Sequence, residues 1–168
     1  MFRLPRSFFN RFVVEVAQDL LGQILVVGSH QGMITETEAY RGADDEASHA
    51  FKGRTPRSSI MFGPPGMSYV YLIYGMYHCL NVVTEGEGFP SAVLIRGLKL
   101  LTLPYIHING PGKLCRELQI TKIHHGMDLI EEPHFYIKEG NYIKNFSSTP
   151  RIGIRMATDK RWRFVADF

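Results

Sequence analysis

The chain has 168 residues, of which 45% are apolar and 21% are charged, a balance typical of a globular protein with one sizeable core. Its net charge of +3 permits a nucleic-acid partner without requiring one. The two cysteines, Cys79 and Cys115, form no CxxC pair, so reduced thiols are expected rather than a disulfide framework or a zinc site. No long apolar segment follows the basic N-terminal residues, so we expect neither a secretory signal nor a membrane span.

The predicted elements begin with a helix over residues 7–21, with Ser7 as its N-cap and Gly22 just after its end. Residues 41–68 are expected to be mostly irregular. Mixed strands with two or more helices predict a single α+β domain over residues 1–168. A short helix is expected over residues 113–118, and strands over residues 23–27, 32–40, 69–71, 78–83, 92–96, 135–137, 151–154 and 163–165.

Four of the eight tyrosines lie between Tyr69 and Tyr77. Tyrosines and apolar residues alternate up to Tyr74-Gly75, where the pattern predicts the turn of a β-hairpin with an aromatic residue at its tip. An exposed aromatic residue at such a tip usually contacts a partner, and on a basic protein it could enter a stack of bases. The alternative is that all four rings pack into a core.

The strand predicted over residues 32–40 would carry Ile34, Glu36, Glu38 and Tyr40 on one face. Glu38 is the leading catalytic candidate, because aromatic surface raises the pKa of a carboxyl group and a nearby arginine, such as Arg96, keeps it ionised. Those influences suit a general base that deprotonates water. Glu36 has the same spacing and competes with it, and a surface glutamate on an edge strand is the alternative.

Three other polar positions are candidates. His49 lies in an acid-rich loop, where histidines are often functional. Asn81, on the second strand of the hairpin, is either a structural pin or a reader of a base edge. The adjacent pair His124-His125 would diverge on a helix or a strand, so we expect it to be exposed and not to bind metal.

Basic residues are concentrated in two segments. Six of them lie between Lys144 and Arg163, and a smaller group is Lys52, Arg54 and Arg57. Either segment could contact phosphates, and the alternative is an ordinary solvated surface.

Taken together, these residues resemble the alkyladenine (3-methyladenine) DNA glycosylase family of base-excision repair enzymes. The resemblance implies a mixed α/β domain with a curved antiparallel sheet, peripheral helices and a protruding hairpin. It covers most of the chain and depends on the segments at residues 36–40, 45–49, 54–57, 61–62, 65–66, 69–77 with Asn81, 92–96, 110–115 and 150–154, of which Tyr69–Tyr77 is the most specific.

The resemblance implies a role for each site residue. Glu38 would activate the hydrolytic water, which Arg96 and the backbone carbonyl of Ile152 would help to hold. Tyr74 would intercalate into the duplex between the flanking Met76 and Tyr77. The extruded base would stack on Tyr40, His49 and Tyr71, and Asn81 at the pocket edge would disfavour guanine by a clash with its exocyclic amine.

The implied substrate is double-stranded DNA that contains alkylated or deaminated purines. No lysine stands in the motif as an amine nucleophile, so hydrolysis without strand cleavage is expected, with no cofactor and no metal. The resemblance also implies a monomer in the bacterial cytoplasm, or in the nucleus of a eukaryote, with no membrane association and no secretion.

Three other classes remain open. One is a damaged-nucleic-acid-binding module that keeps the pocket but lacks turnover. Another is a glycoside hydrolase that pairs Glu38 with an acid from residues 44–46. The third is an interaction protein that buries the hairpin in a homodimer.

Overall fold

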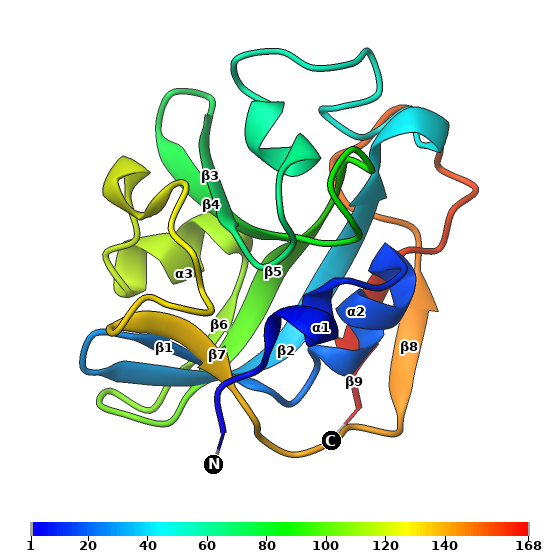
Figure 1. Ribbon diagram of the computed structural model, residues 1–168. Coiled ribbons are helices and arrows are strands. Elements are labelled where there is room, and N and C mark those ends of the chain that lie inside the picture. The colour runs from blue at the N-terminus through cyan, green and yellow to red at the C-terminus, as the bar shows by residue number, and fades with distance from the viewer. Residues whose placement is uncertain (1, 168) are drawn as a thin grey trace.

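The computed structural model describes residues 2–167, and its centre is one curved, nine-stranded antiparallel sheet (Figure 1). The main path runs β3-β4-β5-β2-β1-β7, while β6 pairs with β5, and β9 lies between β2 and β8. The strands are β1 (Ile24–Val27), β2 (His30–Arg41), β3 (Ser68–Ile73), β4 (Tyr77–Val83), β5 (Ser91–Leu100), β6 (His107–Asn109), β7 (Phe135–Lys138), β8 (Phe146–Thr149) and β9 (Arg163–Ala166).

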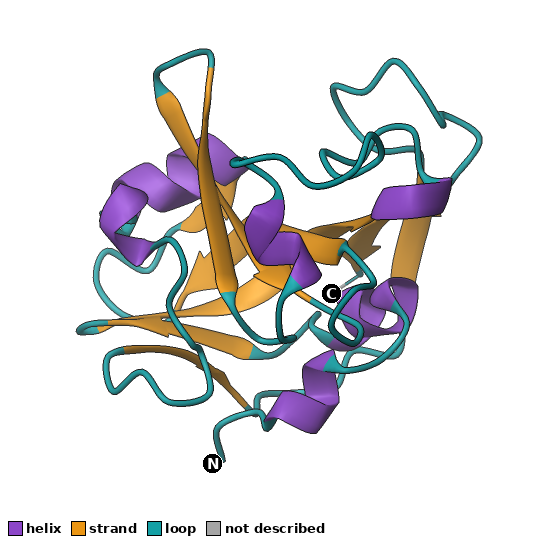
Figure 2. Ribbon diagram, turned by 45° about the horizontal axis from the view of Figure 1, so that its top comes forward, coloured by secondary structure: helices purple, strands orange, loops and turns teal. Residues whose placement is uncertain are grey.

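Short helices lie at the periphery of the sheet, and the expected α+β class is confirmed (Figure 2). Helix α2 packs Val13 and Val16 into the main core. The Thr37 hydroxyl of β2 donates a hydrogen bond of 2.8 Å to the carbonyl of Ala17 in this helix, which fixes α2 against the centre of the sheet. The helices are α1 (Arg6–Phe9), α2 (Val13–Asp19) and α3 (Pro111–Glu117), with single 3-10 turns at Gly42–Asp44, Ser59–Phe62 and Lys122–His124.

The single helix predicted over residues 7–21 is wrong, because α1 and α2 replace it. The backbone leaves helical geometry at Phe12, where ψ is 129°. This break lets Phe9 enter the core with 1% of its surface exposed, while Phe12 packs edge-on against Trp162. In a continuous helix these two rings would lie on one face and could not reach separate partners. Ser7 therefore lies inside α1 and is not an N-cap.

Two predictions for the strands also need correction. Residues 151–154 form a loop, because the Ile152 N–H donates to the Glu38 carboxylate and not to a neighbouring strand. Arg96 lies within β5 and does not end it, and β6 and β8 were not predicted. The other predicted strands and the helix near residues 113–118 are confirmed in position.

An irregularity in β2 decides which side chains face the functional site. The register against β5 is disturbed around Glu36. Ile34 and Ala39 both lie in the main core, although a regular strand would place them on opposite faces. The prediction that Ile34 shares a face with Glu38 is therefore wrong. Gly97 lies opposite the irregularity, and a Cβ there would stand 2.6 Å from a side-chain oxygen of β2, so this position requires a glycine.

Strands β3 and β4 form the predicted hairpin, which projects beyond the rest of the molecule (Figures 1 and 2). Tyr74 and Gly75 at its tip have φ angles of 53° and 65°, and the Met76 N–H donates to the Ile73 carbonyl at 3.0 Å. Positive φ at both residues together with this bond is typical of a type I′ turn, and since Ile73 pairs with Tyr77, Met76 is the third residue of the loop. Tyr74 is 89% exposed, so the alternative in which all four tyrosines pack into a core is wrong.

A buried ion pair joins the loop after β2 to the loop after β8. Two nitrogens of Arg151 lie 2.5 and 2.8 Å from the two carboxylate oxygens of Asp45, and neither side chain is exposed. Arg151 also donates to the carbonyl of Ala39, and Asp45 accepts the N–H groups of Arg41 and Ala47. The pair therefore holds two irregular segments in fixed positions beside the sheet.

Replacing Asp45 by asparagine should lower the free energy of unfolding by about 3–5 kcal/mol, because it leaves a buried guanidinium without its counter-charge. The matched control is Asp44→Asn, since the Asp44 carboxylate is 56% exposed and pairs with Arg41 at the surface. That control should lose less than about 1 kcal/mol. Urea denaturation measures both. Equally small losses would contradict the importance assigned to the buried pair.

Candidate active site

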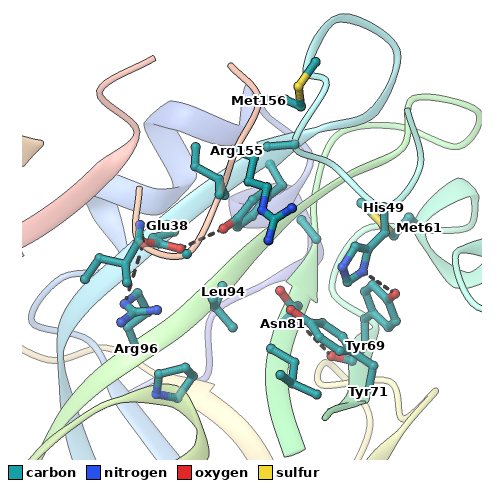
Figure 3. A pocket seen from close by; sticks show the side chains of 18 of the residues that line it. Glu38, His49, Met61, Tyr69, Tyr71, Asn81, Leu94, Arg96, Arg155 and Met156 are labelled. Carbon is teal, nitrogen blue, oxygen red and sulfur yellow. Dashed lines mark hydrogen bonds and ion pairs between the residues drawn. The ribbon is translucent and has the colours of Figure 1, made fainter. Parts of the chain in front are cut away.

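A cavity of about 430 Å³ opens between the base of the hairpin, the loop after β2 and the loop between β8 and β9 (Figure 3). Two predicted site residues, Met76 and Tyr77, lie outside it on the hairpin, 71% and 45% exposed. The other eight line the cavity: Glu38, Tyr40, His49, Tyr71, Tyr74, Asn81, Arg96 and Ile152.

Glu38 is the buried carboxylate of this cavity, with no exposed side-chain surface. Its Oε1 accepts a hydrogen bond of 2.8 Å from the Tyr40 hydroxyl, and its Oε2 accepts one of 2.7 Å from the Ile152 N–H. The Nε of Arg96 lies 3.7 Å from Oε2. Each oxygen thus accepts one hydrogen bond, from donors in two different segments of the chain, and the Arg96 charge from a third segment lies nearby.

Burial and these neighbours have opposite effects on the pKa of Glu38. Burial dominates and raises the pKa above its ordinary value of 4.5, whereas the Arg96 charge, the Ile152 N–H and the Tyr40 hydroxyl each lower it. Burial and the nearby Glu38 charge raise the pKa of Tyr40, so its hydroxyl remains a donor. A carboxylate in this position can accept a proton from a water molecule near neutral pH.

Glu36, the competing candidate, is engaged elsewhere. Its Oε2 accepts hydrogen bonds from Arg96 at 2.9 Å and from Arg163 at 2.7 Å, and it is not among the residues that line the cavity. Arg96 lies closer to Glu36 than to Glu38, so it links the two carboxylates instead of pairing with Glu38 alone. Of these two carboxylates, Glu38 is therefore the one that lines the cavity.

Aromatic rings form the opposite wall. His49 packs edge-on against Tyr71 with 4.6 Å between ring centroids, and its Nδ1 is hydrogen-bonded to the Tyr69 hydroxyl at 2.9 Å. The Arg57 guanidinium lies 4.9 Å from the centroid of the Tyr71 ring. Burial and the Arg57 charge lower the pKa of His49 to about 4, so this histidine is neutral at physiological pH. The rings of this wall are inclined to one another, and the imidazole adds no charge to it.

Asn81 pairs with Tyr69 in the hairpin register, and its Nδ2 donates to the Tyr69 carbonyl at 3.2 Å. It is 3% exposed. This bond makes Asn81 a structural pin between β3 and β4. Its side chain also lines the cavity, so its role as a reader of a base edge stays a prediction.

Several residues of the site were not singled out from the sequence as site residues. The Asp45–Arg151 pair joins positions 106 residues apart, so no local spacing could reveal it. Met61 and Arg155 also line the cavity, from irregular segments whose course depends on packing. In the sequence, Asp45, Met61 and Arg151 belong only to segments that carry the family resemblance, and Arg155 only to a basic segment.

The remaining candidates lie outside the cavity. Cys79 and Cys115 are buried free thiols, and burial raises their pKa values to about 11 and 12. The Nδ1 atoms of His124 and His125 accept backbone N–H groups. Within residues 2–167, no cluster of three potential metal-ligating side chains occurs, and no helix is long and apolar enough to span a bilayer.

The acids considered for a glycoside hydrolase are differently placed. Asp44 pairs with Arg41 at the surface, and Asp45 forms its buried ion pair with Arg151. Of the three acids, only Glu46 lines the cavity with Glu38. The cavity is otherwise largely aromatic and apolar, unlike a polar sugar cleft. A buried carboxylate in an aromatic cavity below an exposed tyrosine instead agrees with the class of enzyme that the sequence resemblance implies, a DNA glycosylase.

Comparison with known proteins agrees with this class. A family model described as Methylpurine-DNA glycosylase (MPG) matches residues 7–167. A protein of Ehrlichia ruminantium (strain Welgevonden), named "Putative 3-methyladenine DNA glycosylase", is 55% identical over 165 residues, which are 96% of this chain and 88% of that protein. Relatives of the same name from Sodalis glossinidius and Rickettsia felis are 53% and 51% identical, again over 96% of this chain, and are themselves covered to 95% and 92%.

The chain belongs to the methylpurine-DNA glycosylase family. It is therefore a DNA glycosylase, a hydrolase of N-glycosyl bonds that takes DNA as its substrate and belongs to base-excision repair. The family resemblance drawn from the sequence is confirmed.

Proposed function

We propose that the domain of residues 1–168 flips alkylated or deaminated purines out of double-stranded DNA and hydrolyses the N-glycosidic bond with a water molecule activated by Glu38. The observation that carries this proposal is the Glu38 carboxylate, which is fully buried, bonded by Tyr40 and Ile152, and turned toward an aromatic cavity of about 430 Å³.

Flipping is necessary because water cannot reach the glycosidic carbon of a base inside the duplex, and it costs a few kcal/mol. Tyr74 at the hairpin tip would fill the gap that the flipped nucleotide leaves, flanked by Met76 and Tyr77. Its 89% exposure and the type I′ turn support this role, since they present a ring on a stiff support. Tyr74 also lines the cavity mouth, so the wedge and the base pocket are adjacent.

The extruded base would stack among Tyr40, His49 and Tyr71, each such contact contributing about 1–3 kcal/mol. Stacking tolerates many purines because every base has a π-face. A neutral His49 supports this role, since it adds no charge that would repel a cationic base. Asn81 at the pocket edge would disfavour guanine by contact with its exocyclic amine.

In the chemical step, Glu38 would take a proton from the water as the water oxygen attacks the anomeric carbon, and the bonding electrons would leave with the base. Arg96 would help to orient the water and keep Glu38 ionised. The Ile152 N–H donates a hydrogen bond to Glu38. We propose that the backbone carbonyl of Ile152 accepts a hydrogen bond from the same water that Glu38 deprotonates. No lysine is among the residues that line the cavity, which supports hydrolysis without an amine adduct and without strand cleavage.

The basic segment between Lys144 and Arg163 offers fewer free charges for phosphate contacts than its composition suggests. Of the six basic residues between Lys144 and Arg163, Arg151 and Arg163 are engaged by carboxylates. A second cavity of about 410 Å³ behind the hairpin is lined by Arg57 and Lys122 with two histidines. We propose that Arg57 and Lys122 contact DNA phosphates next to the intercalating Tyr74. We also propose that the protein is a cytoplasmic monomer.

Release of hypoxanthine from a duplex oligonucleotide, by the wild type and by Glu38→Gln, tests the proposed function. The wild type should release the base, and the variant should be slower by a factor of at least about 100, because an amide cannot take the proton from water. If neither protein releases hypoxanthine, the same pair is tested on 3-methyladenine, which is the better leaving group. Lesion binding without release of either base would replace this proposal by the binding-module alternative.

Tyr74→Ala should reduce the preference for a hypoxanthine-containing duplex over an undamaged one by about tenfold, since the loss of one stacking contact is worth about 1–3 kcal/mol. Titrations of both duplexes at one salt concentration measure this preference. The control is Tyr142→Ala, which removes another exposed tyrosine, outside the cavity, and should leave the preference unchanged. An unaltered preference in Tyr74→Ala would rule out the wedge.

A further inference from the structure

Arg155 occupies a position in the cavity that the mechanism above does not use. It lies on the loop between β8 and β9, and its side chain points into the cavity between Glu38 and His49 (Figure 3). The beginning of this loop is fixed, because Arg151 is clamped by Asp45 and the Ile152 N–H is bonded to Glu38. Arg155 is therefore presented from an anchored segment, with its guanidinium inside the proposed base pocket.

The donors of Arg155 are free, unlike those of its neighbours. Arg151 pairs with Asp45, Arg163 pairs with Glu36, and Arg161 donates to a backbone carbonyl. Across the described part of the chain, Arg155 makes no hydrogen bond or ion pair, and as a whole the residue is exposed to solvent while it lines the cavity. Its five N–H groups are thus available to a ligand.

Other polar groups of the cavity are already engaged within the protein. The Tyr40 hydroxyl donates to Glu38, His49 is bonded to the Tyr69 hydroxyl, and the Asn81 amide nitrogen donates to a backbone carbonyl. Arg96 also lines the cavity, but its Nε is bonded to Glu36 and the proposed mechanism assigns it to the water, so Arg155 is the guanidinium left to donate to a flipped base that presents acceptors.

A guanidinium binds two adjacent acceptors in a bidentate manner, as O6 and N7 of a 6-oxopurine provide. At the same edge, adenine presents a 6-amino group, which is a donor that a guanidinium cannot accept. We propose that Arg155 is a specificity-determining residue that hydrogen-bonds the flipped base and favours neutral 6-oxopurines, such as hypoxanthine, over cationic N-alkylated adenines. This inference rests on the function proposed above.

Charge acts in the same direction. Glu38, Glu46 and Arg96 also line the cavity, so without Arg155 two carboxylates would face one guanidinium, a balance that favours a cationic base. The Arg155 guanidinium offsets this attraction and repels the positive charge that an N3-alkylated adenine carries while it is still attached to the sugar. A neutral base experiences no such repulsion and gains the hydrogen bonds.

Single-turnover release of hypoxanthine and of 3-methyladenine from duplex DNA tests the proposal. Arg155→Gln should lower the ratio of the hypoxanthine rate to the 3-methyladenine rate at least tenfold, through slower release of hypoxanthine and unchanged or faster release of 3-methyladenine. Arg155→Lys keeps the charge but not the planar fork, so it should slow hypoxanthine release and leave 3-methyladenine release as in the wild type.

The control is Lys144→Gln, which removes an exposed positive charge outside the cavity and should leave the ratio unchanged. An equal decrease of both release rates in Arg155→Gln would overturn the assignment and indicate a phosphate contact. Unchanged rates for both bases would also overturn it, because the side chain would then have no role in release. If the wild type releases neither base, the proposed function itself fails. That result differs from a wild type that releases both bases in a ratio independent of Arg155.

Discussion

The carboxyl group of Glu38, which has no exposed side-chain surface, is the constraint on which the rest of this structure depends. In an apolar cavity, an isolated Glu38 would take up a proton and could not serve as the base that we propose. The Tyr40 hydroxyl, the Ile152 N–H and the Arg96 charge oppose this effect of burial. These groups come from β2, from the loop after β8 and from β5, so the site exists only when distant segments are held together.

The fold meets this constraint with two long strands beneath the cavity and two anchored loops at its sides. The long strands β2 and β5 carry Glu38 and Arg96, and their irregularity turns the carboxylates away from the main core. The Asp45–Arg151 pair then fixes both loops that border the cavity. The hairpin projects away from this framework and exposes the Tyr74 ring. The ring can enter DNA, as we propose, only because it is not packed in the protein's own core.

Local patterns predicted some of these features and not others. The hairpin and its exposed tip follow from alternation and a Tyr-Gly turn, and the family resemblance selected eight residues that line one cavity. The break before α2 depends on where Phe12 finds a partner, and the loop at residues 151–154 depends on a carboxylate more than 100 residues away. Such contacts leave no periodic signal in the chain. Arg155 appeared only as one member of a basic segment.

The most direct test of the account is the pH dependence of single-turnover hypoxanthine release by the wild type and by Tyr40→Phe. The rate should fall in acid as Glu38 becomes protonated. Since the Tyr40 hydroxyl lowers the pKa of Glu38, its removal should move the midpoint of this fall to higher pH. Tyr71→Phe is the control, because no hydrogen bond joins Tyr71 to Glu38 among the described residues, and its midpoint should match the wild type. A midpoint unchanged in Tyr40→Phe would contradict the claim that the buried, hydrogen-bonded Glu38 carboxylate is the base.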